Sequence, residues 1–147
     1  MAGGSPESRE TGAPAETERA GAALAATLRP GEVVLVSGEL GAGKTTWVRG
    51  ALRALGVTAA VTSPTYVVGL LYDADRGRVA HLDLYRLDGL EDEDPGLLDP
   101  YFGPDLITFV EWPEQAGSGD PTLGRPVAAR VTITHGGADR RAITVRR

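Results

Sequence analysis

The sequence predicts a protein of the α/β class, and three of its features indicate that class. Residues 33–36 and 106–110 are short apolar runs rich in β-branched side chains, which is typical of buried strands. After the first run comes a glycine-rich segment, and apolar residues then recur at helical spacing from 47 to 55. The remaining strand-like runs occur in pairs separated by short polar turns and predict two β-hairpins, 66–72 with 78–85 and, at the C-terminal end, 127–134 with 142–147.

The N-terminal part of the chain divides into two segments by composition. Residues 1–15 are small, polar and proline-bearing, which predicts a disordered tail, and residues 16–147 are then expected to form a single domain. Apolar residues on one stripe predict a helix over residues 16–28. Thr17 is the expected N-cap of this helix, because its hydroxyl can accept a free backbone N–H of the first turn.

The segments between the main elements are predicted less directly. Gly56 stands where a glycine commonly closes a helix, and residues 57–61 are expected to form a short strand. Residues 87–98 are acidic and expected to be helical in part, with a break at Pro95 and Gly96. A glycine- and proline-rich loop is expected at 113–126.

The segment between the first strand and its helix matches the phosphate-binding pattern G-x-x-x-x-G-K-[ST]. Residues 38–45 are G-E-L-G-A-G-K-T. A strand, a glycine loop and a helix in this order direct successive backbone N–H groups and a helix N-terminus at a polyphosphate. Lys44 is the only lysine of the chain, the other fourteen cationic side chains being arginine. This single flexible ammonium occupies the position that would contact a β- or γ-phosphate.

A phosphate site of this kind needs Mg²⁺ and a carboxylate that helps to place it. The Thr45 hydroxyl is the expected first ligand. Glu111 directly follows the apolar strand 106–110, and Asp83 lies in an alternating run that puts His81 on the same face. Acids at strand ends are often only solvated, and His81 is equally compatible with a packed core histidine. The pattern favours Glu111 over Asp83 as the functional carboxylate.

The composition limits the possible functions. A formal charge of −5 argues against autonomous binding to nucleic acid, which normally requires a basic face. The absence of cysteine excludes disulfides, thiolate zinc sites and a cysteine nucleophile, and it fits a reducing cytoplasm. No apolar run approaches the roughly 20 residues of a membrane span, and the start of the chain lacks the features of a secretory signal. We therefore expect a cytoplasmic protein without a membrane segment.

Missing motifs narrow the choice of nucleotide. The chain contains no asparagine, so the guanine-specific N-K-x-D motif cannot occur, and no D-x-x-G is present. A regulatory GTPase is thus disfavoured and ATP is expected. A small-molecule kinase stays open, because such enzymes share the P-loop and the size. They generally carry an arginine-bearing lid, whereas Arg76 and Arg78 lie in a predicted tight hairpin.

Together these motifs resemble the TsaE family, the small P-loop ATPases of bacterial tRNA threonylcarbamoyladenosine synthesis. The matching segments occur in the family's order and spacing: G-E-L-G-A-G-K-T-T at 38–46, S-P-T-Y at 63–66, H-L-D-L-Y-R at 81–86, Y-F at 101–102 and E-W-P-E at 111–114. The resemblance extends from residue 17 to about residue 115. It departs at Pro95 and Gly96, where the family more often has helix-forming residues, and it is loose in the C-terminal hairpin.

The resemblance implies a P-loop NTPase-like fold with a central mixed β-sheet flanked by helices. It implies that ATP is bound by Gly41, Ala42, Gly43, Lys44, Thr45 and Thr46, with Thr17 near the adenine and Arg140 near the nucleotide. It implies Mg²⁺ at Thr45 and Glu111, with Asp83 nearby. The same resemblance makes 63–65 a switch-like loop in which Thr65 senses the γ-phosphate, and assigns the catalytic roles to Lys44, Glu111, Asp83 and Thr65.

The resemblance also implies a partner. A member of the TsaE family docks on the TsaB–TsaD heterodimer, and its ATP hydrolysis supports repeated turnover of that synthase on tRNA. The expected function is therefore a partner-dependent, Mg²⁺-requiring ATPase. The alternatives are a small-molecule kinase that uses the same P-loop and a nucleotide-bound scaffold that hardly hydrolyses ATP.

Overall fold

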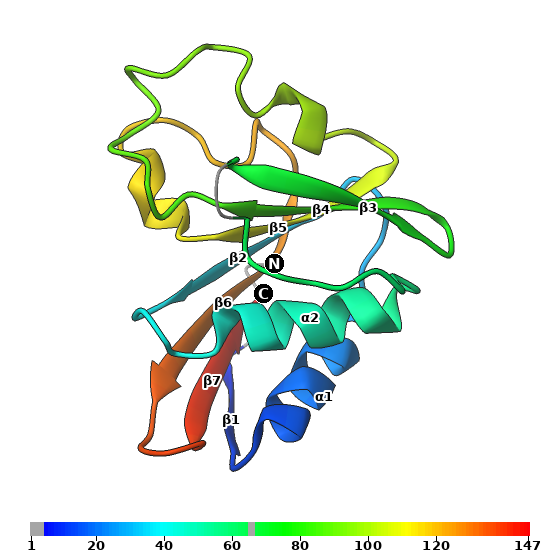
Figure 1. Ribbon diagram of the computed structural model, residues 1–147, viewed down its shortest axis with the longest axis vertical. Coiled ribbons are helices and arrows are strands. Elements are labelled where there is room, and N and C mark those ends of the chain that lie inside the picture. The colour runs from blue at the N-terminus through cyan, green and yellow to red at the C-terminus, as the bar shows by residue number, and fades with distance from the viewer. Residues whose placement is uncertain (1–4, 65–66) are drawn as a thin grey trace.

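Seven strands form one mixed sheet in the computed structural model, which describes residues 5–64 and 67–147 (Figure 1). Their order across the sheet is β1-β7-β6-β2-β5-β4-β3. The strands are β1 Glu7–Thr11, β2 Val33–Gly38, β3 Gly69–Ala74, β4 Gly77–Asp83, β5 Leu106–Glu111, β6 Val127–His135 and β7 Arg141–Arg146. Strands β6, β2, β5 and β4 are parallel, and antiparallel strands flank them at both edges. The predicted α/β class with a central mixed sheet is thus confirmed.

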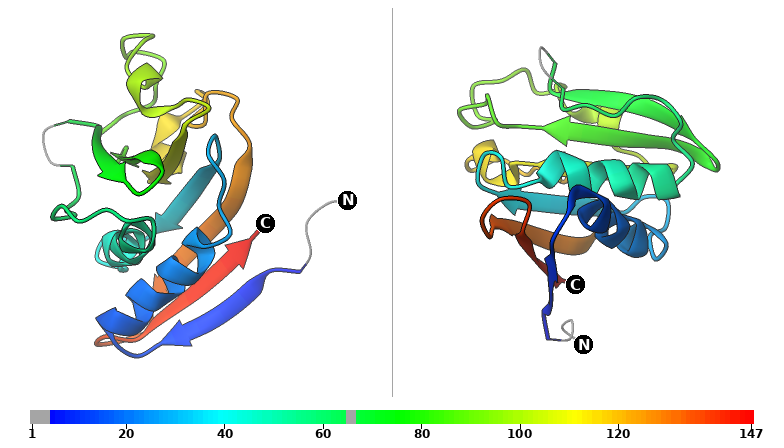
Figure 2. Two further views of the ribbon diagram at one scale, coloured as in Figure 1. Left: turned by 90° about the vertical axis from the view of Figure 1, so that its right-hand side faces the viewer. Right: turned by 60° about the horizontal axis from the view of Figure 1, so that its bottom comes forward.

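Two α-helices cover one face of this sheet, α1 Pro14–Ala25 and α2 Lys44–Ala54 (Figure 2). They pack with their backbones in close approach. A Cβ atom on Gly50 of α2 would lie 1.9 Å from the carbonyl oxygen of Glu18 on α1, so only glycine allows this spacing. Helix α2 ends in a Schellman motif, in which Gly56 donates to Arg53 and Val57 donates to Leu52, as the position of Gly56 predicted.

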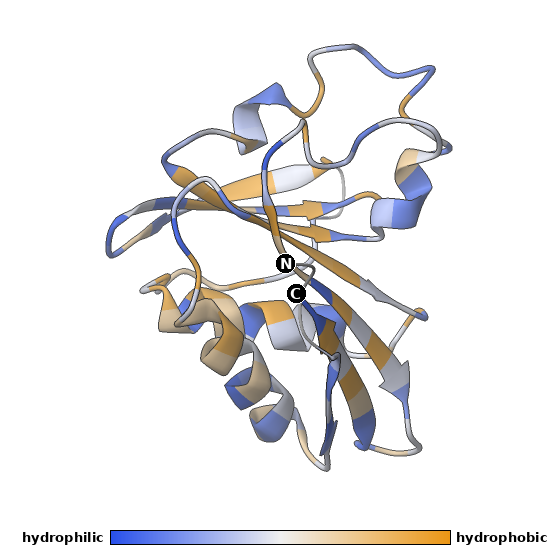
Figure 3. Cartoon of the chain, turned by 180° about the vertical axis from the view of Figure 1, so that it is seen from behind, coloured by the Kyte–Doolittle hydropathy of each residue, from blue (hydrophilic) through white to orange (hydrophobic). Residues whose placement is uncertain are grey.

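The sheet has an apolar core on each face, because successive strand residues point to opposite sides. Val34 and Val36 of β2 belong to the larger core under α1 and α2, whereas Val33 and Leu35 belong to a smaller one. The smaller core is covered by the segments that follow β4 and β5, including the short 3₁₀ helices η1 Asp99–Tyr101 and η2 Pro113–Ala116. Figure 3 shows the resulting apolar bands along the central strands.

The N-terminal segment differs from the prediction of a disordered tail over residues 1–15. Glu7–Thr11 forms the edge strand β1, antiparallel to β7, and residues 1–4 lie outside the described part of the chain. Helix α1 then begins at Pro14 with Ala13 as its N-cap, so the prediction of Thr17 as the cap was wrong. A polar composition could not reveal β1, because the backbone of β7 supplies its hydrogen-bond partners.

Three further predictions of local structure need correction. Residues 57–61 form no strand, because the chain leaves α2 through its closing turn and then runs over the core with Val57 and Val61 buried. Residues 87–98 form turns and no α-helix. The first hairpin is confirmed as β3 with β4, but β3 starts at Gly69, and Tyr66 lies outside the described residues. The C-terminal hairpin of β6 and β7 is confirmed.

None of the helices formed by residues 5–64 and 67–147 has the length and apolar character required to cross a lipid bilayer.

Candidate active site

The ends of three parallel strands meet at one edge of the sheet. Strand β2 ends at Gly38 and continues into the glycine loop, while Asp83 and Glu111 are the last residues of β4 and β5. In the register of the sheet Asp83 lies opposite Glu111, and Glu111 lies opposite Val36. Ligands of open α/β sheets bind at such carboxyl ends of strands. The structure therefore brings the predicted phosphate loop and both predicted carboxylates together.

The glycine loop delivers the start of α2 to this edge. Gly43 is the N-cap of α2 and adopts a left-handed conformation, with φ of 100°. It provides no side-chain cap, so the first backbone N–H groups of the helix are available to an anion. A larger residue at this position would be strained and would also approach Arg141, whose Nε lies 3.3 Å from an ideal Cβ.

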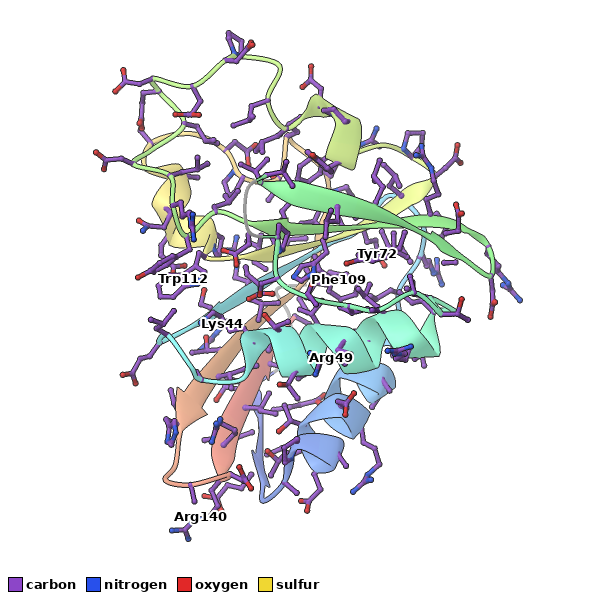
Figure 4. All side chains as sticks on the ribbon, in the orientation of Figure 1. Lys44, Arg49, Tyr72, Phe109, Trp112 and Arg140 are labelled. Atoms are coloured by element: carbon purple, nitrogen blue, oxygen red, sulfur yellow. The ribbon has the colours of Figure 1, made fainter. Side chains whose placement is uncertain are left out.

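Lys44 is held in place by three contacts. Its Nζ donates hydrogen bonds of 2.7 Å to the carbonyl oxygens of Gly38 and Glu39, and it lies 4.3 Å from the ring centroid of Trp112. Burial lowers the pKa of Lys44, and nearby carboxylates, above all Glu111, oppose that shift. Figure 4 shows Lys44 and Trp112 on the same side of the strand ends. The ammonium is thus pre-positioned beside the glycine loop.

Glu111 is the centre of a buried hydrogen-bond network. The hydroxyl of Thr45 donates to both carboxylate oxygens, at 3.2 and 3.1 Å. The Thr45 hydroxyl has one hydrogen, which it gives to Glu111. In its 2.5 Å contact with Ser63 it therefore accepts the hydrogen bond, and Ser63 is the donor. On its other side Glu111 is 2.5 Å from Nε2 of His81. Glu111 is 2% exposed, so its orientation is set by these partners.

Asp83 has a more open environment. It is half-buried, and one carboxylate oxygen accepts a 3.0 Å hydrogen bond from the backbone N–H of Tyr85. Desolvation raises the pKa of Asp83, the Tyr85 bond lowers it, and the charge of Glu111 raises it further. Two carboxylates thus face a common space in which their charges oppose each other.

The donor set at this edge fits Mg²⁺. Thr45 offers a hydroxyl oxygen and Glu111 and Asp83 offer carboxylate oxygens, which are the hard ligands that this ion prefers. Within the described residues no group of three or more His, Cys, Asp or Glu side chains could hold a metal ion. Mg²⁺ does not need such a cage, because it is usually held by one or two carboxylates together with waters and substrate phosphates.

A hollow of about 540 Å³ adjoins Asp83. Its lining is mostly apolar and combines the glycine loop, the segment after β4 and residues around the predicted switch: Leu40, Ser63, Pro64, Val67, Val68, Asp83, Tyr85, Arg86, Leu87 and Trp112. The rings of Tyr85 and Trp112 are in contact, tilted by 52° with their centroids 4.8 Å apart. The hollow therefore lies between the glycine loop and the segment that follows β4.

The other predicted binding residues lie on separate elements of the fold. Thr46 is in the first turn of α2 and half-buried. Thr17 is buried in α1, where its hydroxyl forms a 2.8 Å hydrogen bond with Thr11. Arg140 lies at the tip of the C-terminal hairpin and points outward (Figure 4). Thr65 lies outside the described residues, so its role as a switch stays a prediction.

Two residues near the loop were not predicted. Arg141, not Arg140, contacts the glycine loop, with a guanidinium nitrogen 3.4 Å from the carbonyl oxygen of Gly41. No local pattern distinguishes the two arginines, because the register of β7 decides which of them turns toward the loop. Trp112 belongs to the E-W-P-E segment that the sequence analysis quotes, but no role was predicted for it. Its contact with Lys44 occurs in the folded chain, where the backbone at Trp112 is left-handed with φ of 58°.

Comparison with known proteins agrees with this architecture. The sequence model of "Threonylcarbamoyl adenosine biosynthesis protein TsaE" matches residues 11–143. The chain belongs to the TsaE family. Its curated relatives include proteins named "tRNA threonylcarbamoyladenosine biosynthesis protein TsaE" from Streptomyces coelicolor, 46% identical over 96 residues, and from Treponema pallidum, 35% identical over 117 residues. The family resemblance of the sequence motifs is thereby confirmed.

The extent of the matches differs between these relatives. The Streptomyces alignment covers 64% of this TsaE chain and 65% of its relative, and the Treponema alignment covers 79% and 85%. Among solved structures, the crystal structure of Bacillus subtilis YdiB is similar, with a TM-score of 0.75 and 30% sequence identity. The match covers 96% of the present chain and 84% of the YdiB chain. The chain thus spans about two thirds of the length of the Streptomyces relative, and nearly all of it fits the YdiB fold.

Proposed function

We propose that this TsaE-family protein is a Mg²⁺-dependent ATPase that acts in the threonylcarbamoyladenosine modification of tRNA. One observation supports the chemistry above all others: Lys44, Thr45 and Glu111 converge at the carboxyl ends of parallel strands, beside an uncapped helix N-terminus. This is the set of groups that cradles a triphosphate and places a metal beside it. The names of the relatives supply the pathway.

Each residue has a distinct proposed task. The backbone N–H groups at the start of α2 bind phosphate oxygens, and Lys44 extends from the loop carbonyls to the β- and γ-phosphates. Thr45 and Glu111 would hold Mg²⁺, with Asp83 nearby, and the ion would supply positive charge beside the phosphates. Glu111 also orients the attacking water. Arg141 stabilises the loop by its contact with Gly41.

Dependence on a partner follows from the exposed apolar rim of the hollow. Leu40, Val67 and Tyr85 are 72%, 55% and 43% exposed, although all three line the hollow next to the phosphate site. Large apolar side chains gathered at a concave surface indicate a contact with another molecule. We assign this contact to the TsaB–TsaD synthase, in keeping with the family resemblance, and accordingly propose a cytoplasmic location.

The same hollow favours a second candidate, a small-molecule kinase. A volume of about 540 Å³ beside the predicted γ-phosphate end lies within the range of small-molecule sites, roughly 300–1,000 Å³. In that case an acceptor would occupy the hollow and Asp83 would face its hydroxyl. The two candidates differ in what binds there, a protein surface or a metabolite.

Phosphate release with and without purified TsaB–TsaD distinguishes the candidates. We expect slow release by the protein alone and a clear stimulation by the complex. Val67→Asp places a charge in the hollow and should abolish the stimulation, whereas Leu123→Asp alters a 40% exposed leucine that does not line the hollow and should not. Absence of stimulation, together with a phosphorylated product from a metabolite extract, would favour the kinase.

A further inference from the structure

His81 is a buried histidine whose one polar contact within the described part of the chain is to Glu111 of the candidate site. Its side chain is 0% exposed, and Nε2 lies 2.5 Å from Oε2 of Glu111. The second ring nitrogen, Nδ1, is buried without a hydrogen-bond partner among the described residues. A carboxylate that binds a cation is ionised and only accepts hydrogen bonds, and in that state of Glu111 the donor of this bond is Nε2.

Packing alone does not account for a histidine at this position. His81 points to the same side of the sheet as Val79, and the register sets it opposite Phe109, in the core beneath α2. An apolar residue would fill this space without burying an unpartnered ring nitrogen, which opposes folding. The imidazole is therefore retained at a cost in stability, and among the described residues its one polar contact is the carboxylate of Glu111.

That contact determines how Glu111 presents its oxygens. Thr45 reaches the carboxylate from the start of α2, whereas His81 reaches Oε2 from strand β4, so the group is held between two elements. Thr45 contacts both oxygens at nearly equal distances, whereas the His81 contact is to Oε2, so the imidazole fixes which of the two oxygens turns toward β4. Loss of the imidazole would free the carboxylate to rotate about its terminal bond.

We propose that His81 is a positioning residue that orients Glu111 for Mg²⁺, an inference that rests on the proposed ATPase function. His81 does not touch nucleotide or metal and acts through Glu111, as second partners of metal-binding carboxylates do. The binding of ATP without metal is left to the glycine loop and Lys44. The consequence is a separation of effects: the requirement for Mg²⁺ depends on His81, whereas metal-free nucleotide binding does not.

Thermal stabilisation by ATP, titrated with Mg²⁺ or measured in EDTA, tests this separation without relying on turnover. We expect His81→Phe to keep the ATP-induced shift in EDTA but to need roughly tenfold more Mg²⁺ for half of the additional shift. Val79→Ala is the matched control, because it removes core volume from the same strand and face. It should lower the melting temperature and leave the Mg²⁺ requirement unchanged.

A second pair of variants serves if His81→Phe does not fold. The amide nitrogen of His81→Gln can reach the place of Nε2, whereas that of His81→Asn corresponds to Nδ1 and falls short of Glu111. We expect the Mg²⁺ requirement of His81→Gln to be closer to that of the unaltered protein than the Mg²⁺ requirement of His81→Asn is. A parental Mg²⁺ requirement in both His81→Phe and His81→Asn, or an equal change in Val79→Ala, would overturn the proposal.

The failure of the proposal differs from the failure of the proposed function. If the unaltered protein shows no ATP-induced shift and no effect of Mg²⁺ upon it, the ATPase assignment itself is wrong. If the unaltered protein shows both and the His81 variants titrate like it, only the positioning role of His81 is wrong.

Discussion

The two carboxylates of the candidate active site end neighbouring parallel strands, yet their surroundings differ. Glu111 is buried and bonded on two sides by Thr45 and His81. Asp83 is half-buried, is capped by the backbone of Tyr85 and borders the open hollow. Strand register places the two side by side, but the elements packed against each strand end decide how much freedom each keeps.

Because their surroundings differ, we expect the two acids to have different roles. A carboxylate held by buried partners can orient a metal or a water reproducibly, because its rotation is restricted. A carboxylate at the border of an open hollow can adjust when a ligand or partner arrives. We therefore expect changes in the buried half of the site, formed by Lys44, His81 and Glu111, to have larger effects than changes at Asp83.

The largest effect is expected for Lys44→Ala, which removes the cation from the buried half. Loss of a charged donor to the transferring phosphate should reduce hydrolysis by roughly 10²–10³-fold or more. The fold should be retained, and ATP affinity should fall, as isothermal titration would show. Arg53→Ala, in the last turn of α2, is the control. A parental rate for Lys44→Ala would mean that the phosphate loop has been assigned to the wrong segment.

Glu111→Gln tests the buried carboxylate with little change in shape. An amide is a poorer Mg²⁺ ligand and cannot accept a proton, so hydrolysis should fall by roughly 10²-fold. ATP binding in EDTA should survive, because the loop N–H groups and Lys44 are untouched. Near-normal phosphate release by this variant would transfer the catalytic role to Asp83 and reverse the comparison.

Asp83→Asn should have a smaller effect that appears mainly in the metal requirement. We expect a higher Mg²⁺ concentration for half-maximal phosphate release, by roughly tenfold, with a modest loss of the maximal rate. Titrating Mg²⁺ in parallel for the Asp83 and Glu111 variants shows which of the two acids contributes more to the maximal rate of phosphate release. Equal losses at saturating Mg²⁺ would show that the open and buried positions are equivalent.

The smallest effect concerns stability in EDTA without nucleotide. The pKa of Asp83 is raised in the native state above its ordinary value of 3.8, which applies to the unfolded state. At a pH between the unfolded-state pKa and the native-state pKa, the native state therefore binds more protons than the unfolded state. Its contribution to stability therefore decreases as pH rises through that interval. Asp83→Asn should lack this component and should melt higher than the parent above the interval. Asp88→Asn, at an exposed position, should not show the gain.

Much of the fold was predictable because its signals are local. The buried strands at 33–36 and 106–110, the loop at 38–45 and the turn at Gly56 each follow from the properties of consecutive residues. Parallel strands place their carboxyl ends at one edge, so the pairing of these two predicted strands was enough to bring the loop to Glu111.

The tertiary structure alone decided the features that depend on a partner distant in sequence. Strand β1 exists because β7 accepts and donates its hydrogen bonds, although residues 7–11 have a polar composition that predicts disorder. Likewise, the register of the final hairpin selects Arg141 over Arg140, and the alignment of β4 with β5 joins His81 to Glu111. Composition and spacing describe one segment at a time, whereas these contacts arise only when separate segments pair. The sequence therefore determined the glycine loop, and the fold determined what surrounds it.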